Sequence, residues 1–571
     1  MAAATTTTTT TTALKRRSRD GEAGRESGAR GMMRPPAVGG TVTGLLFLAV
    51  VMVVVWGGTY RRQTWPEMLI WGQGGVAASS SSANCVGQES NEFYGFYFLF
   101  FSDEENDASP SSVDKLLGGL LSPDFEEASC LSRYQAALYR KPSLYSPSAH
   151  LLRRLRDYEA LHRKCAPHTD LYNRSAALLR SAAGNASAPA ECNYVVWIPH
   201  NGIGNRVLTI VSAFFYALLN HKVLLLHSTD DFAGLLCEPF PGTTWTLPAD
   251  FPLHNLLELD TGAPQSFGNL LKSKDSSIGS RSHVYLHLPW YYREGDKRFF
   301  CEDAQRTLRK VPWLLLKSDH YFVPSLFLVP EYAGELRRLF PERSAVFHHL
   351  VRYLLHPSNE VWERVVGNYR EYFEGADERV GIQIRVFDNF PVPFDQMLNQ
   401  VMNCSLGAGV LPAVTGEAAS SVDAKVKAVV VTNLRSGYSE RIREVYHQQA
   451  TATGEVVRVF QPSHEEAQAT EHRGHNVKAL AEIELLSLSD VLVTSAWSTF
   501  GYVAQGLGGL KPWVLLRHTQ SADACRRAAS PEPCFLMPPA PAQCFRDGGG
   551  NAMLSNVRQC EDEVNGIKLF D

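Results

Sequence analysis

Three short segments of the chain carry side chains that could bind a charged ligand. In the first, Gly202-Ile-Gly204 is followed at once by Asn205 and Arg206, between a strand-like run and a helical pattern. The glycines let the backbone approach a ligand closely, and the N-terminus of the following helix favours an anion. The amide and the guanidinium can bind a sugar hydroxyl or a phosphate. Because the third glycine of G-x-G-x-x-G is missing, a purely structural turn is the alternative interpretation.

The second segment is Gly381-Ile-Gln383-Ile-Arg385, at the C-terminal end of a strand-like run. Strand alternation places Gln383 and Arg385 on the same face, at the edge of the sheet where ligands bind. An arginine there can hold a pyrophosphate with two hydrogen bonds and stabilise the charge that builds up as a diphosphate departs. An ion pair with Asp388 at the strand end is the structural alternative.

The third segment joins a strand to a helix and is rich in hydroxyl groups. It contains Ser495, Trp497, Ser498, Thr499 and Phe500. The hydroxyls and the backbone amides could bind phosphate oxygens, and an aromatic ring could pack near a base. A helix cap with aromatic residues in the core explains part of the same pattern.

Metal and acid/base chemistry have weaker support in the sequence. The chain contains no Asp-x-Asp triplet, so cationic side chains would have to replace a divalent metal. His348-His349 and His464-Glu465-Glu466 lack the H-E-x-x-H spacing of a metalloprotease, which indicates polar or packing histidines. Many carboxylates are available, but no spacing singles out a catalytic pair.

An alternation of strands and helices surrounds the three segments. A strand at 194–199, a helix at 205–220 and a strand at 223–227 form a βαβ unit. A second series of strands, at 380–386, 428–432, 456–460, 490–494 and 512–516, alternates with helices at 438–449, 476–488 and 499–507. This pattern predicts two parallel sheets covered on both faces, in lobes 191–375 and 376–516, with the site in the cleft between them.

The N-terminal part predicts a membrane anchor. Residues 35–60 contain no charged residue, which suits one spanning helix at 37–60. The arginine-rich residues before it predict a disordered cytosolic tail at 1–36. After the anchor we expect a flexible luminal stem at 61–88 and then a helical scaffold at 89–190. A cleaved signal peptide is the alternative, which the long leader disfavours.

Charge and cysteine content narrow the class of protein. The 571-residue chain has a formal net charge of −4 and no basic stripe, which argues against nucleic-acid binding. Its eleven cysteines form no C-x-x-C pair and favour disulfides in an oxidising lumen, with at least one cysteine left over and a cysteine-containing C-terminal segment at 517–571. Sequons at Asn173, Asn185 and Asn403 are compatible with the luminal side.

Five ordered blocks carry a resemblance to a known family. They are Cys192-Asn-Tyr-Val-Val-Trp-Ile-Pro-His-Asn-Gly-Ile-Gly-Asn-Arg206, Cys237-Glu-Pro-Phe-Pro-Gly-Thr-Thr-Trp245, Val311-Pro-Trp-Leu-Leu-Leu-Lys-Ser-Asp319, Val346-Phe-His-His349 and Val493-Thr-Ser-Ala-Trp-Ser-Thr-Phe-Gly-Tyr-Val-Ala-Gln-Gly506. Together they resemble the plant galactoside 2-α-L-fucosyltransferases, the xyloglucan fucosyltransferase family.

The resemblance implies an α/β, GT-B-like enzyme with two Rossmann-like lobes and a cleft between them. It implies an inverting, metal-independent transferase without cofactor, a single-pass type II protein of the Golgi membrane. Its donor would be GDP-fucose, and its acceptor O2 of a terminal β-galactose on a galactosylated cell-wall polysaccharide, with xyloglucan as the first expectation. A homodimer is compatible with it.

The resemblance also implies roles for individual residues. Arg385 matches an arginine that binds the diphosphate; Gln383 and Val386 replace a histidine and a second arginine of the wider H-x-R-R-x-D motif, which leaves Arg385 as the main cation. Asn205, Arg206, Gln383, Ser495, Trp497, Ser498, Thr499 and Phe500 are expected on the donor side of the site. Asp319, His348 and His349 are expected on the acceptor side, with Asp319 as a candidate base.

Two other functions stay open at this stage. The acceptor could be an arabinogalactan protein or a pectic side chain, since members of the family differ in acceptor. A catalytically inactive, glycan-binding Golgi membrane protein with the same fold is the alternative of a different class.

Overall fold

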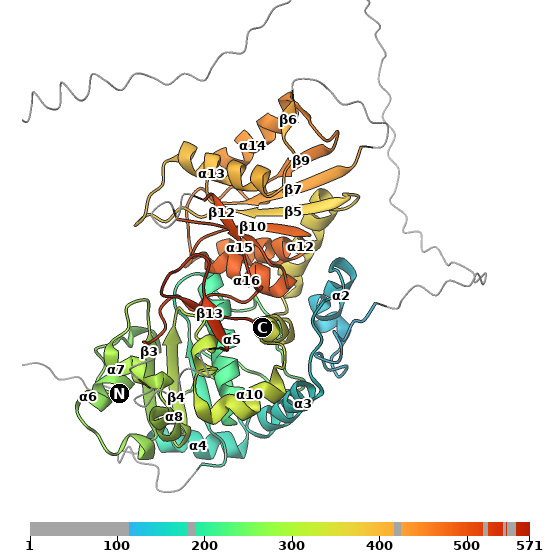
Figure 1. Cartoon of the computed structure of the whole chain (residues 1–571). Helices are drawn as coiled ribbons and strands as arrows, with labels where there is room; N and C mark the ends of the chain where they lie inside the picture. Colours follow the sequence, from blue (N-terminus) through green and yellow to red (C-terminus); the bar gives the residue numbers. More distant parts are fainter. Residues whose placement is uncertain (1–112, 181–189, 416–423, 518–522, 541–543, 545–554) are drawn as a thin grey trace, which may run out of the picture. The chain divides into compact units, whose positions relative to one another are not determined.

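The computed structural model describes residues 113–180, 190–415, 424–517, 523–540, 544 and 555–571 (Figure 1). The expected cytosolic tail, membrane anchor and stem lie outside the described residues, as does the sequon at Asn185. The described chain forms two parallel sheets flanked by helices, which confirms the predicted two-lobed α/β fold.

The first sheet has the strand order β2-β1-β4-β3 and is parallel throughout. Its strands are β1 (Tyr194–Ile198), β2 (Val223–Leu226), β3 (His283–Leu288) and β4 (Trp313–Ser318). Every residue of β1 and β2 is buried, as expected for strands covered on both faces. The predicted βαβ unit is confirmed as β1, α5 and β2, whereas β3 and β4 are strands that the sequence analysis missed.

Helix α5 (Ile203–Asn220) is the core helix of this first lobe. Among the described residues it is the one helix long and apolar enough to cross a membrane, yet 94% of it is buried inside the protein. Its apolar character therefore reflects packing between the lobes. Apolar side chains lie on all its faces and include Phe214 and Phe215, both fully buried.

The second sheet has the order β12-β11-β10-β5-β7-β9. Its strands are β5 (Glu378–Gln383), β7 (Val426–Thr432), β9 (Val456–Phe460), β10 (Val491–Ser495), β11 (Trp513–Leu515) and β12 (Cys525–Arg527). The five strands predicted for this lobe are confirmed, and they pair in parallel. Strand β5 ends at Gln383, earlier than predicted, so Arg385 lies just beyond it. The antiparallel edge strand β12 extends this sheet beyond the predicted lobe boundary at 516, because it belongs to the C-terminal segment 517–571.

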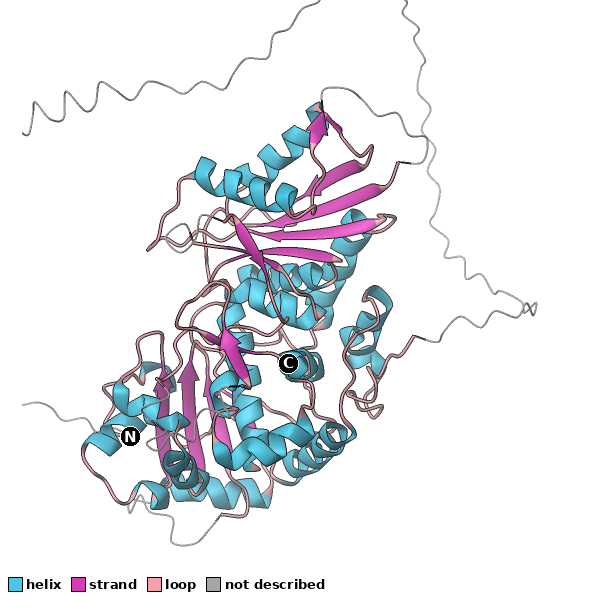
Figure 2. Ribbon diagram, viewed as in Figure 1, coloured by secondary structure: helices cyan, strands magenta, loops and turns pink. Residues whose placement is uncertain are grey.

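Helices cover both faces of the second sheet (Figure 2). One face packs on α13 (Phe394–Gly407) and α14 (Gly437–Gln448), through Val401, Tyr438 and Ile442. The other face packs on α12 (Asn359–Tyr372), α15 (Arg473–Ser487) and α16 (Thr499–Gly508). Helix α12 precedes the predicted lobe boundary at 376 but contacts α15 and β7.

The two lobes share one apolar core. Helix α16 of the second lobe contacts α5 and α11 (Val346–Leu354), so side chains of both lobes belong to a single buried cluster. Two glycines allow the close approach. A Cβ atom at Gly204 would lie 2.8 Å from the backbone nitrogen of Phe500, and one at Gly506 would overlap the ring of Phe347.

The N-terminal helices and the C-terminal segment brace this core. The former are α2 (Leu131–Tyr139), α3 (Ala149–Lys164), which Ser148 caps, and α4 (Asp170–Arg180). The latter contains the hairpin β13 (Val557–Gln559) and β14 (Ile567–Leu569). The remaining short elements are α6 (Phe267–Lys272), α7 (Glu294–Lys297), α8 (Glu302–Arg309), α9 (Val323–Leu326), α10 (Ala333–Leu339), β6 (Val414–Thr415) and β8 (Ala450–Thr451).

Five disulfides join distant parts of the chain, as the cysteine content predicted. They are Cys130–Cys237, Cys165–Cys192, Cys301–Cys544, Cys404–Cys525 and Cys534–Cys560. The remaining cysteine, Cys85, lies outside the described residues. Such cross-links restrict the unfolded chain and persist in an oxidising compartment.

Replacement of Gly204 tests the contact between the lobes. We expect Gly204→Ala to lower the free energy of unfolding by about 1–3 kcal/mol, because the added methyl group meets backbone that cannot move aside. Gly367→Ala is the matched control, since a Cβ atom there has no neighbour within 4 Å in helix α12. It should raise stability by about 0.5–1 kcal/mol. Chemical denaturation measures both, and equal effects would contradict the assigned contact.

Candidate functional site

A pocket of about 850 Å³ lies between the two sheets. It is bordered by the loop after β1, the ends of β5 and β7, one face of α15 and the start of α16. This is the carboxyl-terminal edge of parallel strands, where ligands of open α/β sheets bind. The predicted site residues that line it are Asn205, Asp319, Gln383, Arg385, Trp497, Ser498, Thr499 and Phe500.

A hydrogen-bonded network crosses the floor of the pocket. Asn201 Nδ2 donates to Asp319 Oδ2 at 3.0 Å, and Asn205 Nδ2 donates to the Asp319 carbonyl at 3.1 Å. From the other lobe, Thr499 Oγ1 donates to Asn205 Oδ1 at 3.2 Å. Asn201 has a positive φ of 59°, a conformation that asparagine tolerates better than most residues. The network therefore fixes Asp319 from both lobes.

Asp319 retains an oxygen for further interactions. It is 9% exposed, and its Oδ1 atom has no hydrogen-bond partner among the described residues. The ring of His320 lies nearby, with Nε2 3.5 Å from Oδ1. Burial lowers the pKa of His320, although Asp319 opposes the shift. Asp319 Oδ1 is therefore available to accept a proton, or a hydrogen bond from a hydroxyl group.

Arg385 lines the same pocket from the second lobe, just beyond the end of β5. Its backbone N–H donates to Ser495 Oγ at 2.8 Å, and its guanidinium donates to Gln468 Oε1 at 2.5 Å. Among the described residues the guanidinium forms no ion pair with a carboxylate, so the alternative of a salt bridge with Asp388 is not observed, although Asp388 acts on it as a nearby charge. Burial lowers the pKa of Arg385, and Asp388 partly offsets this. A half-buried cation whose hydrogen-bond partner is a neutral amide has charge available for an anionic ligand.

Gln383 and Ser495 hold the ends of two neighbouring strands together. The Ser495 N–H donates to Gln383 Oε1 at 3.2 Å, and Ser495 Oγ donates to the Gln383 carbonyl at 3.3 Å. Both side chains are buried, and Ser495 is not among the residues that line the main pocket. The pair thus supports the backbone from which Arg385 projects.

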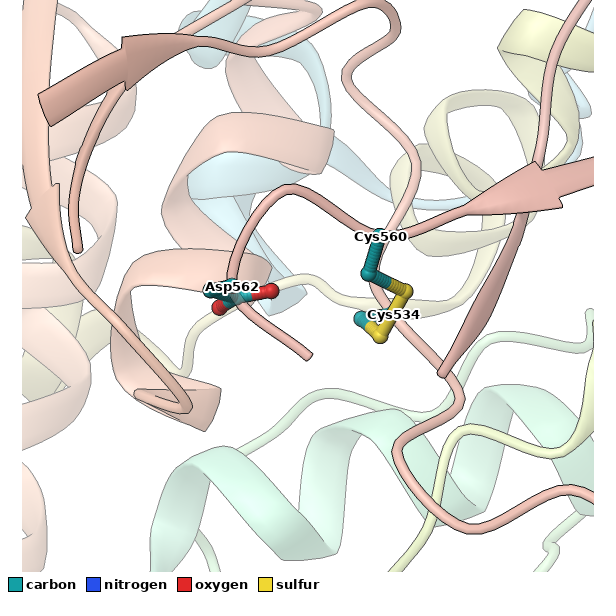
Figure 3. Close-up of side chains that lie close together, drawn as sticks. All are labelled: Cys534, Cys560 and Asp562. Carbon is teal, nitrogen blue, oxygen red and sulfur yellow. A yellow bond between two sulfur atoms is a disulfide. The ribbon is translucent and has the colours of Figure 1, made fainter. Parts of the chain in front are cut away.

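Trp497 is held in place by the C-terminal segment. Its φ is +61°, and its N–H donates to Asp562 Oδ2 at 2.9 Å, which also accepts a hydrogen bond from the Tyr502 hydroxyl at 2.6 Å. Asp562 lies near Cys534 and Cys560, a grouping that resembles a metal site (Figure 3). The two sulfurs are joined to each other as a disulfide, so neither offers the thiolate that a metal would need.

Helix α16 begins at the pocket. Its N-cap residue Ser498 makes no side-chain cap hydrogen bond, and Ser498, Thr499 and Phe500 all line the cavity. The first N–H groups of a helix carry a partial positive charge. This end of α16 and Arg385 together make one wall of the pocket favourable for phosphate oxygens.

One face of α15 forms a wall of the pocket that was not predicted from the sequence. His475, Lys478, Ala479 and Glu482 line the pocket at helical spacing. Glu465 pairs with both His475, at 2.9 Å, and Lys478. Burial raises the pKa of Glu482 to about 7. The spacing of these polar residues along a helix was the available signal, but solvent-facing helices show the same pattern.

Comparison with known proteins identifies the family. The family model described as xyloglucan fucosyltransferase matches residues 97–544. The chain belongs to the xyloglucan fucosyltransferase family. A galactoside 2-alpha-L-fucosyltransferase of Pisum sativum is 50% identical over 467 residues, which is 80% of this chain and 82% of the relative. The enzyme of the same name from Arabidopsis thaliana is 49% identical and covers 80% of this chain and 83% of the relative.

A solved structure agrees with this membership. It is a mutant of Arabidopsis thaliana FUT1 in complex with GDP, 47% identical in sequence, with a TM-score of 0.74. The match covers 80% of this chain and all 100% of the solved chain. The two-sheet fold of this family member therefore has an experimental counterpart.

Arg206 was expected to bind the donor, but the structure places it elsewhere. It is 5% exposed and is not among the residues that line the pocket. Its guanidinium donates to Asp231 Oδ2 at 2.5 Å and to the Asn201 carbonyl at 2.8 Å. Asn476 of α15 donates to the same Asp231 oxygen at 3.2 Å. Arg206 thus positions the Asn201 loop, because both its partners are protein groups.

His348 and His349 were expected near the acceptor. Both are buried on α11 and neither lines the pocket. His348 bonds Ser143 Oγ, the Gly506 carbonyl and Arg352, and burial lowers the pKa of His348 far below its usual value and that of His349 to about 4. This placement favours the packing interpretation. The sequons Asn173 and Asn403 are exposed, on α4 and α13.

Removal of the Arg206 side chain tests its structural role. We expect Arg206→Ala to lower the free energy of unfolding at pH 7 by about 3–5 kcal/mol, because Asp231 is left buried and unpaired. Burial alone would raise the pKa of Asp231, but hydrogen bonds that include one from Arg206 hold it below the usual value. This contribution is present above the unfolded pKa and is lost as the pH falls, so the difference from wild type should narrow in acid.

Denaturation curves at several pH values measure this effect. A variant with wild-type stability and weakened nucleotide binding would instead assign Arg206 to the donor.

Proposed function

We propose that the chain transfers L-fucose from GDP-fucose to O2 of a terminal β-D-galactose on a cell-wall glycan, with xyloglucan as the acceptor. The observation that carries the proposal is that Arg385 of one lobe and Asp319 of the other line the same pocket. The names of the relatives from pea and Arabidopsis support fucose and galactose. The GDP in the related solved structure supports the nucleotide.

The second lobe supplies the donor side. Arg385, whose guanidinium forms no ion pair among the described residues, would bind the diphosphate of GDP-fucose together with the first N–H groups of α16. Negative charge grows on the β-phosphate as its bond to the fucose anomeric carbon breaks. A fixed cation at this place stabilises the transition state more than the bound donor. The cavity volume of about 850 Å³ lies in the range of small-molecule and cofactor sites.

The first lobe supplies the acceptor side. The galactose O2 atom would attack the anomeric carbon on the face opposite the departing GDP, which inverts the configuration. The new C–O bond forms as the bond to the β-phosphate oxygen breaks, and the O2 proton passes to Asp319 Oδ1, directly or through a water molecule. A transition state in which departure leads needs only a weak base, which a carboxylate provides.

The remaining parts of the proposal concern metal and membrane. Arg385 and the α16 terminus would take the place that a divalent cation holds in other transferases, so we expect activity without added metal.

The apolar stretch at 37–60 would anchor a type II protein in the Golgi membrane with the lobes in the lumen. A galactosylated polysaccharide passing through the same lumen is then within reach.

Loss of the Arg385 guanidinium tests the donor side. We expect Arg385→Ala to lower kcat by about 100-fold or more, equivalent to about 3 kcal/mol of transition-state stabilisation. Arg370→Ala, an exposed arginine on α12, is the control and should keep wild-type turnover. The assay follows GDP release from GDP-fucose with a galactosylated oligosaccharide. Near-normal turnover by Arg385→Ala would remove this residue from the mechanism.

Neutralisation of Asp319 tests the acceptor side. We expect Asp319→Asn to reduce transfer by about 100-fold, in the usual range for loss of a general base. Slow hydrolysis of GDP-fucose in the absence of acceptor should be much less affected. Asp395→Asn makes the same chemical change at an exposed position of α13 and should leave transfer intact. Full transfer by Asp319→Asn would make the base assignment wrong.

The acceptor itself is identified with the purified full chain in detergent. Galactosylated xyloglucan and arabinogalactan oligosaccharides are offered with GDP-fucose, and NMR locates the new linkage. We expect an α-linked fucose on galactose O2 of xyloglucan. Fucose on arabinose, or no transfer to any galactoside, would contradict the proposal.

A further inference from the structure

An exposed aromatic side chain stands at the mouth of the pocket. Tyr291 is 79% exposed, yet it lines the cavity, on the loop that follows β3. Its neighbour Trp290 also lines the cavity, with ring centroids 6.3 Å apart. A large ring left in water contributes little to folding, so Tyr291 is available to contact a ligand that extends from the cavity.

Aromatic rings continue from Trp290 into the second lobe. The ring of Trp290 lies 5.6 Å from that of Trp497, which lies 5.6 Å from that of Phe390. Phe390 is 50% exposed, and the guanidinium of Arg517 lies over Trp497 at 3.8 Å. Trp290, Tyr291, Trp497 and Phe390 together are here named the aromatic rim. Both lobes contribute to it, so it borders the cleft on one continuous side.

The inner end of the aromatic rim lies next to the acceptor side of the site. The ring of Trp290 is 5.8 Å from that of His320, whose Nε2 atom is 3.5 Å from Asp319 Oδ1. Tyr291 follows Trp290 in sequence, and its side chain is far more exposed than that of Trp290. A molecule held at Asp319 that extends out of the pocket along the loop after β3 would therefore pass Tyr291.

The chemistry of the rim fits a sugar ring. In a pyranose whose hydroxyl groups are equatorial, the axial C–H hydrogens make each face of the ring apolar. Such C–H groups are attracted to the electron-rich face of an aromatic ring. A nucleobase also stacks on aromatic rings, but Trp290 and Tyr291 belong to the lobe of Asp319, whereas Arg385 and α16 lie in the other lobe.

We propose that Tyr291 forms an outer acceptor subsite, which binds a pyranose ring other than the galactose that receives fucose. The inference rests on the proposed function, and it adds that the protein selects extended acceptors over short galactosides. Binding across Tyr291 holds the chain of sugars while Asp319 engages the terminal galactose. Because the ring of Tyr291 is exposed, its replacement should change neither the stability of the fold nor the binding of the donor.

The experiment uses the full chain as wild type, Tyr291→Ala, Tyr291→Phe and Leu144→Ala. Leu144 is 92% exposed and does not line the main pocket, so it controls for loss of a surface apolar group. For a galactosylated xyloglucan oligosaccharide we expect Tyr291→Ala to raise KM by about tenfold. For a galactosyl disaccharide the KM should change by less than about twofold. Tyr291→Phe and Leu144→Ala should match wild type with both acceptors.

Equilibrium titrations separate this inference from the proposed function. GDP should bind wild type and Tyr291→Ala equally, and the oligosaccharide should bind wild type more tightly. An oligosaccharide that binds wild type and Tyr291→Ala equally would overturn the outer subsite, as would a weakened affinity for GDP. If the oligosaccharide binds tightly and depends on Tyr291 but receives no fucose, the proposed function fails and the glycan subsite stands.

Discussion

The site depends on the close contact between the starts of helices α5 and α16. Gly204 lets the backbone of one lobe touch Thr499 and Phe500 of the other, with no room for a Cβ atom. The hydrogen bond from Thr499 to Asn205 then links this contact to Asp319. The same few residues therefore join the lobes, present a helix terminus and place a carboxylate. Packing and chemistry cannot be varied independently here.

Features set by neighbours in the sequence were predictable. The βαβ unit around Gly202-Ile-Gly204, the second series of strands and the positions of Gln383, Arg385 and the Ser495 to Phe500 loop follow from local patterns. Strands β3 and β4 were missed because apolar runs of six residues do not distinguish a strand from a buried helix segment. The prediction of the donor and the acceptor came from the family resemblance and not from periodicity.

Features set by distant partners were not predictable. Arg206 looks like a phosphate ligand beside two glycines, but Asp231 neutralises it inside the core. His348 and His349 differ from site histidines only through their burial on α11. Both the face of α15 that lines the pocket and the rim residue Tyr291 could be recognised as part of the site only from the positions of the two lobes. A sequence specifies which groups are present, while burial and pairing decide which of them remain available.

The hold of Asp562 on Trp497 has a consequence for biosynthesis. The loop that carries Trp497 is held by Asp562, which follows it in sequence by 65 residues, and Asp571 accepts hydrogen bonds from the backbone of Arg343 and Ser344. Chains emerge from the ribosome N-terminus first, so the two sheets can form before these anchors exist. The loop that carries Trp497 therefore reaches its final conformation only after a segment far along the chain has folded back onto it.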